Sequence, residues 1–107
     1  MINNNLPPQQ LKTLKTRGKS FDPETAVAFG LVIRAERIRQ EIAQDQFALL
    51  ADVDRSYYGK LERGERQPSL ALILRIAGGL GVTASDLIGR TELVLKQELR
   101  QPLLLQF

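Results

Sequence analysis

The stretch DRSYYGKLERGERQPS, residues 54–69, gathers four basic side chains around two tyrosines and a glycine. On a helix, at 100° per residue, its basic and small residues fall within one arc of roughly 140°. The members of that arc are Arg55, Ser56, Gly59, Lys60 and Arg63. The other arc holds Tyr57, Tyr58, Leu61 and Glu62. The pattern predicts a helix with an aromatic and aliphatic side toward the core and an acid-free cationic side toward solvent.

Capping residues divide the rest of the chain into short helices. The first is expected from Asp22-Pro23 to about Gln40, because Asp is a favoured N-cap and Pro suits the first helical position. Further helices are expected at 43–51, 55–63, 70–80, 84–88 and 92–100. The residues expected to start or stop them are Asp54, Gly64, Ser69, Gly81, Thr83, Gly89, Thr91 and Pro102. No segment alternates as a strand does, so the sequence predicts an all-α fold.

The first helix carries apolar residues at helical spacing. The stripe consists of Val27, Leu31, Ile38 and Ile42, interrupted by Arg34. Beside it lie Ala26, Phe29, Gly30, Ile33 and Arg37. We therefore take the stripe as the apolar face of this helix.

The composition is that of one small globular domain with tails: 107 residues, 43% apolar and 25% charged. Cysteine and histidine are absent, which removes thiolate chemistry, the commonest general base and the commonest zinc ligands. We expect neither an enzyme nor a cofactor. No apolar run approaches the ~20 residues of a membrane span. The N-terminal sequence MINNNLPPQQ lacks the apolar core of a secretory signal peptide. A cytoplasmic protein is expected, and its net charge of +3 permits an anionic partner.

From Phe29 to Ile88 the chain resembles the helix-turn-helix DNA-binding domain of the XRE family, which includes phage repressors and Cro-like regulators. The matching segments are IRAER (33–37), QDQFALLADVDRSYYGKLERGERQPSL (44–70) and LRIAGGLGVTASDLI (74–88). The third-helix segment is particularly similar to controller proteins of restriction-modification systems. The resemblance implies a five-helix repressor-like domain and a role in transcription regulation, as a repressor, controller or antitoxin-type regulator.

This chain departs from the family pattern at a few positions. Asp52 stands where glycine is common in the turn, but Asp tolerates the left-handed conformation better than most residues. Glycine is also common where Glu41 stands, so that loop is expected to differ. Tyr58 replaces a usual Ile or Val, and its hydroxyl must find a partner or reach solvent. The resemblance further implies an ion pair between Arg37 and Glu62, which we take as structural.

The resemblance places the third helix in the major groove of double-stranded DNA. Arg55 is the first candidate for reading a base, through a bidentate guanine contact, with a phosphate contact as the alternative. Ser56 and Lys60 are candidates for base or phosphate contacts. Tyr57 would touch a thymine methyl or a sugar, or else pack on the core. Gly59 would allow close approach of the backbone, or else only loosen the helix.

Other residues are expected to contact the DNA backbone. Gln44 resembles the family residue that contacts phosphate from the start of the second helix, the alternative being a simple helix start. Arg63 and Arg66 would hold phosphates beyond the third helix. Arg34 and Arg39 are more simply explained as solvated charges.

The C-terminal segment is more apolar than a 60-residue core can cover. Besides Leu72 and Ile76 on the fourth helix, it adds Leu93, Val94, Leu95, Leu99 and PLLLQF (102–107). Either the tail packs on its own domain, or it forms a dimer interface. We favour a homodimer, because a palindromic operator requires two-fold symmetry.

Three parts are therefore expected: a flexible basic arm (1–20), the helix-turn-helix domain (21–89), and a C-terminal helix and tail (90–107). The leading hypothesis is a homodimeric, sequence-specific regulator that binds a palindromic operator at the nucleoid of a bacterium or phage host, with no membrane association. The alternative is a protein-interaction module, antitoxin-like, for which DNA binding is secondary.

Overall fold

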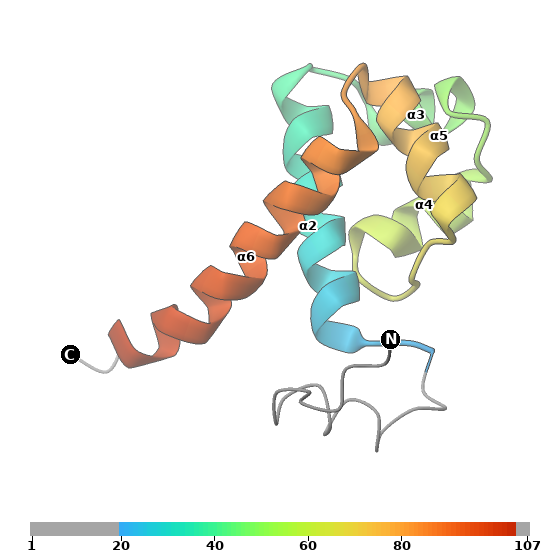
Figure 1. The fold of residues 1–107 in the computed structure, drawn as a ribbon. Coiled ribbons are helices and arrows are strands. Elements are labelled where there is room, and N and C mark those ends of the chain that lie inside the picture. The colour runs from blue at the N-terminus through green and yellow to red at the C-terminus, as the bar shows by residue number, and fades with distance from the viewer. Residues whose placement is uncertain (1–19, 105–107) are drawn as a thin grey trace, which may run out of the picture.

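The structure is a computed structural model that describes residues 20–104, with side chains described as far as Gln97. It is all-α within this range, as predicted. Five helices follow one another in the order α2 (Pro23–Arg39), α3 (Gln44–Leu50), α4 (Arg55–Glu62), α5 (Leu70–Leu80) and α6 (Ala84–Leu104). Helices α2 to α5 form a compact group, and α6 crosses α2 and continues beyond it (Figure 1). The predicted basic arm (1–20) lies outside the described residues, apart from Ser20.

Most predicted helix starts are confirmed. The Asp22 carboxylate accepts a hydrogen bond from the Thr25 amide (3.1 Å), with Pro23 at the first helical position. Asp54 and Ser69 accept in the same way from the amides of Tyr57 (2.9 Å) and Leu72 (3.2 Å). These side chains satisfy backbone donors that no helical carbonyl reaches. The helix starts are therefore fixed locally, by residues beside them in the sequence.

The predicted apolar face of α2 is wrong. Val27, Leu31 and Ile38 are each nearly half exposed, whereas the flanking Phe29 and Ile33 are buried. The reason is steric, because a Cβ on Gly30 would lie 2.5 Å from the Leu61 carbonyl oxygen. Only the glycine face of α2 can approach α4 this closely. Of the stripe with the clearest spacing, Ile42, beyond the end of α2, packs against the core, and the three apolar residues within α2 are left on the surface.

The core lies where α2, α3, α4 and α5 meet the first turns of α6. Phe47 and Tyr58 form its aromatic centre, with ring centroids 5.2 Å apart and the rings tilted by 52°. Ile76 is completely buried and Leu72 packs against the core, so the expectation that both remain free for an interface is wrong. The Tyr58 hydroxyl neither reaches solvent nor has a hydrogen-bond partner among the described residues. Burial raises the pKa of this phenol above its ordinary value.

The last two predicted helices are one. Helix α6 continues through Gly89 and Thr91, and Pro102 lies within it rather than after its end. Thr91 is not a cap: it is buried and its hydroxyl donates to the Leu87 carbonyl (2.8 Å). Packing of α6 along α2 outweighs the helix-weakening effect of glycine, which is about 1 kcal/mol. The predicted start at Thr83 is correct, because its hydroxyl accepts from the Asp86 amide (3.0 Å).

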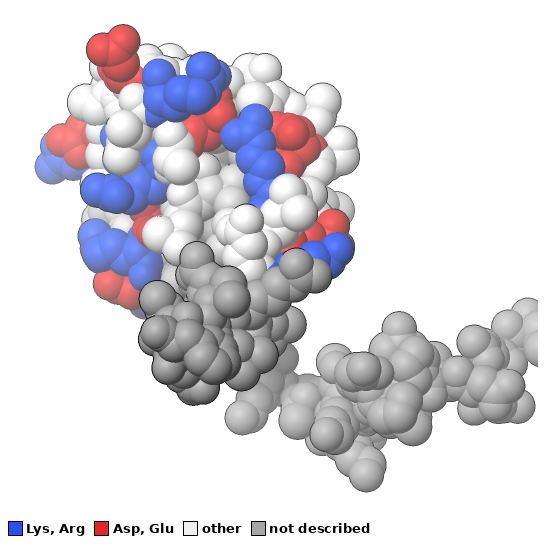
Figure 2. Space-filling model, turned by 90° about the vertical axis from the view of Figure 1, so that its left-hand side faces the viewer, with Lys and Arg blue, Asp and Glu red and all other residues white. Residues whose placement is uncertain are grey.

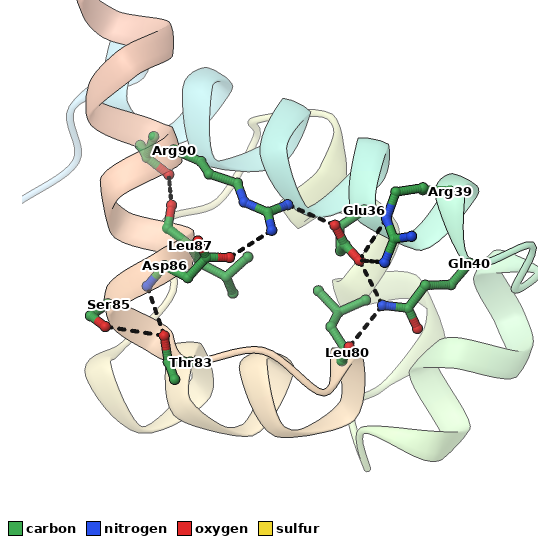
Figure 3. A network of polar contacts seen from close by, with 10 residues as sticks. Glu36, Arg39, Gln40, Leu80, Thr83, Ser85, Asp86, Leu87 and Arg90 are labelled. Carbon is green, nitrogen blue, oxygen red and sulfur yellow. Dashed lines mark hydrogen bonds and ion pairs between the residues drawn. The ribbon is translucent and has the colours of Figure 1, made fainter.

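A polar network fixes α6 against α2 (Figure 3). The buried Glu36 carboxylate accepts hydrogen bonds from Arg39 (2.6 Å) and Gln40 (2.7 Å) on one oxygen and from Arg90 (2.6 Å) on the other. Arg90 also pairs with Asp86 (2.6 Å). The hydrogen bonds from Arg39, Arg90 and Gln40 hold the pKa of Glu36 at about 2. The network therefore sets the direction in which α6 leaves the domain.

Within the described residues, no single helix is long and apolar enough to cross a membrane. The pair formed by α5 and the first part of α6 reaches the required length and hydropathy only jointly, and it is bent by 103° at the break.

Candidate DNA-binding surface

Helices α3 and α4 form the helix-turn-helix unit, joined by residues 51–54. Asp52 adopts a left-handed conformation (φ 58°), as expected for a residue in a glycine position. The Val53 amide donates to the Ala48 carbonyl (2.9 Å), and its side chain packs against the core. The turn is thus held from both its backbone and its side chain. Glu41, before α3, also has a positive φ of 59°, so this loop uses another non-glycine residue where glycine is usual.

The expected pair of Arg37 and Glu62 holds α4 at its C-terminal end. The guanidinium donates from Nε (2.6 Å) and Nη2 (2.9 Å) to the two carboxylate oxygens. Burial alone would raise the pKa of Glu62, but the hydrogen bonds from Arg37 and Gln44 outweigh it and hold the pKa below its ordinary value. Arg37 also donates to the Ile42 carbonyl (2.7 Å). Because Glu62 points inward, it leaves the opposite arc of α4 free of acid.

The Gln44 side chain, expected to contact phosphate, is held by a hydrogen bond within the domain. Its side-chain amide donates to Glu62 (2.9 Å), which ties the start of α3 to the end of α4. Gly59 is buried beneath it, since a Cβ there would lie 3.5 Å from the Gln44 side-chain oxygen and 3.2 Å from Arg63. The 3.5 Å contact with Gln44 would be an ordinary one, and the Arg63 guanidinium is the end of a flexible side chain, so the packing of α3 against α4 does not require glycine here. The hydrogen bond between Gln44 and Glu62 is an intramolecular role that the sequence did not indicate.

The basic residues of the predicted arc lie where α4 is exposed. Arg55 and Ser56 are exposed at its first turn, and Lys60 and Tyr57 are half-buried further along. Tyr57 packs against the core and also borders a shallow pocket next to Leu72. The position of Tyr57 is thus compatible with both of the roles expected from the sequence, packing on the core and contact with DNA.

Two acids border this arc from outside α4. Asp45 on α3 pairs with Arg55 (3.2 Å), and Glu65 beyond α4 pairs with Arg63 (2.8 Å). Arg66 donates to the Glu65 carbonyl (2.9 Å). All four paired side chains are at least half exposed, and such pairs contribute little to stability. A phosphate can therefore replace the carboxylate at little cost in folding energy.

Sequence reasoning missed Asp45, Glu65 and Leu49. The two acids lie outside the helix whose arc was analysed, so helical periodicity could not connect them to it. Leu49 is 83% exposed and lines an open groove of about 550 Å³ between α3 and Arg55. Its position opposite Phe47 and Ala48 on α3 was the available clue.

The comparisons with known proteins define the class. A helix-turn-helix family model, HTH_3, matches residues 33–87. The chain therefore belongs to this family, the XRE-type DNA-binding transcriptional regulators, which are not enzymes.

Two known proteins and one solved structure are similar in sequence to part of this chain. The control protein C.MunI of a Mycoplasma species is 37% identical over 62 residues, which cover 55% of this chain and 84% of that protein. The immunity repressor of Bacillus phage phi105 is 33% identical over 69 residues, covering 64% of this chain and 48% of that protein. The restriction-modification controller C.AhdI from Aeromonas hydrophila, whose crystal structure is known, is 39% identical in sequence to this chain. The two structures match with a TM-score of 0.57 over 58% of this chain and 94% of that one.

A further solved structure has a similar fold. The clp gene regulator ClgR from Corynebacterium glutamicum superposes with a TM-score of 0.72, covering 77% of this chain and 87% of that one. At 22% identity this likeness concerns the fold alone.

Proposed function

We propose that this chain is a homodimeric, sequence-specific regulator that places α4 in the major groove of a palindromic operator. The observation that carries this proposal is the division of α4 into two sides. Tyr58, Leu61 and Glu62 are buried on one side, while Arg55 and Ser56 are exposed on the other, at the end where the helix dipole favours anions. This is the arrangement in which the N-terminal residues of a recognition helix reach base edges.

Within this proposal the residues take different roles. Arg55 reads a base, because its guanidinium is exposed at the start of α4 and can form a bidentate pair with guanine. Ser56, Tyr57 and Lys60 contact bases, sugars or phosphates along the same groove. Gly59 allows close approach of the backbone, and Gln44 contacts a phosphate from the start of α3. Arg63 and Arg66 contact phosphates beyond the helix.

The type of regulator is proposed from the relatives. C.AhdI is a restriction-modification controller by name, C.MunI is a control protein, and the phi105 protein is an immunity repressor. We infer a regulator of this kind, working in the cytoplasm at the nucleoid. The division into arm, DNA-binding domain and tail at residues 20 and 89 also remains a proposal, since α6 crosses the second boundary without a break.

Selection of bound duplexes from a random DNA pool tests the proposal. The full chain should enrich one palindromic sequence with two half-sites about 34 Å apart, and binding should weaken steeply as salt rises. The Arg55→Ala chain should enrich a motif that has lost preference at one position of each half-site. Enrichment of no motif by a chain that is folded and dimeric would favour the protein-interaction alternative.

A further inference from the structure

An open groove runs along the seam between α2 and α6. It has a volume of about 430 Å³ and is lined by Leu31, Val32, Arg34, Ala35, Arg90 and Val94. We call it the α2–α6 groove. Viewed from the side toward which α6 projects, a band of uncharged surface lies between groups of charged side chains (Figure 2).

The groove continues into a wider apolar surface on α2. Val27, Leu31 and Ile38 are 44%, 46% and 49% exposed and share one face of that helix. These three large aliphatic side chains share the face with the exposed Arg34, which lies between Leu31 and Ile38, and exposed aliphatic side chains gathered on one face are typical of an interaction site. This surface has no role in the proposed DNA contacts.

Helix α6 carries a second apolar surface that its own domain leaves uncovered. Leu87 and Thr91 are buried and Val94 still packs against the core, but the last part of the helix continues beyond α2 (Figure 1), and Leu93 is 58% exposed. The sequence of the rest of the helix is strongly apolar, with Leu95, Leu99, Leu103 and Leu104. A projecting helix of this composition requires a partner surface.

We propose that the α2–α6 groove is occupied by the projecting part of α6 from a second copy of this chain. Both uncovered surfaces belong to the same polypeptide and adjoin each other where α6 leaves α2. A two-fold axis would therefore satisfy both at once, with each α6 entering the groove of the other copy. The proposal rests on the homodimer of the proposed function and assigns its interface.

Charge supports a second copy of this chain as the occupant. Arg34 stands exposed at the edge of the groove and forms no ion pair among the described residues, and the same holds for Glu92 on α6. The tail adds Glu98 in sequence. The cationic edge of each groove thus meets acidic positions on the helix that enters it. Arg90 is already paired with Glu36 and Asp86, and so holds α6 at the angle from which it can reach the partner.

The experiment is sedimentation equilibrium of the full-length chain and three variants. Leu31→Glu places a charge in the groove, and Leu93→Lys places one on the entering helix. Leu74→Glu is the matched control, since Leu74 is an exposed leucine on α5 (56%) that does not line the groove. All three positions are on solvent-exposed helix faces, and circular dichroism and thermal melting verify the fold of each variant.

The wild type and Leu74→Glu should sediment as dimers, while Leu31→Glu and Leu93→Lys should each raise the dimer dissociation constant about tenfold or more, as expected for charging a buried apolar contact. An equimolar mixture of the two should recover dimers. In that heterodimer one groove keeps its Leu31–Leu93 pairing, and the other pairs the new glutamate with the new lysine.

Two results would overturn the assignment. If Leu31→Glu and Leu93→Lys both dimerise as well as the wild type, or if Leu74→Glu alone dissociates, the interface lies elsewhere while the homodimeric regulator stands. A wild-type chain that stays monomeric at all concentrations contradicts both the interface and the homodimer, and leaves the base-reading role of α4 to the selection experiment.

Discussion

Arg37 and Glu62, 25 positions apart in the chain, face each other through two hydrogen bonds of 2.6 and 2.9 Å. Their side chains are only 10% and 1% exposed, so the pair is buried between α2 and α4. The Glu62 carboxylate also accepts from Gln44, the first residue of α3. One carboxylate thus joins the three helices on which the proposed DNA-binding surface depends.

Replacing Glu62 by Ala should destabilise the fold strongly. The change leaves the Arg37 guanidinium buried without its partner, a situation that typically costs about 3–5 kcal/mol. Chemical denaturation followed by circular dichroism measures the free energy of unfolding. Glu65→Ala, which removes the exposed partner of Arg63, is the control and should leave stability nearly unchanged. Equal losses in both variants would show that burial of the Arg37 pair contributes nothing.

Stability should fall in acid, largely through Glu36. The pKa of this carboxyl is about 2 in the folded chain, below its ordinary value of 4.5. A lowered pKa means that the ionised form favours folding, so the contribution is complete above pH 4.5 and is lost as the pH falls toward 2. Glu62, whose pKa is also lowered, acts in the same direction.

The measurement is urea denaturation between pH 2 and pH 6. Glu36→Gln should be less stable than the wild type at pH 6, and the difference should shrink as the pH falls. A difference that stays constant over this range would contradict the assignment of the acid sensitivity to Glu36.

Local chemistry explains what the sequence could predict of this fold. Asp54, Ser69 and Gly81 start or end helices through atoms within a few residues, and their positions were predicted correctly. The exposed arc of α4 was also predictable, because the aromatic and aliphatic residues opposite it define its inner side. The Arg37–Glu62 pair followed from the family resemblance rather than from periodicity.

Tertiary contacts explain what the sequence could not predict. The buried face of α2 is decided by the close approach of Gly30 to Leu61, which apolar spacing does not reveal. The continuity of α6 through Gly89 depends on its packing along α2. In the candidate site, Asp45 reaches Arg55 from α3 and Glu65 reaches Arg63 from just after the end of α4, so no pattern within α4 indicates them.

Alanine substitutions at two helical glycines should have opposite effects. In Gly30→Ala the new methyl would lie 2.5 and 2.6 Å from the carbonyl oxygens of Leu61 and Glu62, and such overpacking costs about 1–3 kcal/mol. In Gly78→Ala the methyl would meet no atom within 4 Å, and the higher helix propensity of Ala should stabilise α5 by up to ~1 kcal/mol. Thermal melting of both variants tests this. A stabilising effect of Gly30→Ala would show that α2 and α4 are further apart than described.

The separate roles proposed for Arg55 and Arg66 lead to the sharpest test on DNA. Arg55→Ala should lose about 1–3 kcal/mol of binding free energy on the selected operator and relax preference at one base position of each half-site. Arg66→Ala should weaken binding to all sequences alike and reduce the salt dependence, because it removes a phosphate contact. Fluorescence anisotropy with the operator and with single-base variants, at several salt concentrations, measures both quantities. If both variants lose affinity uniformly across sequences, Arg55 contacts phosphate, and base reading must come from Ser56, Tyr57 or Lys60 further along the exposed side of α4.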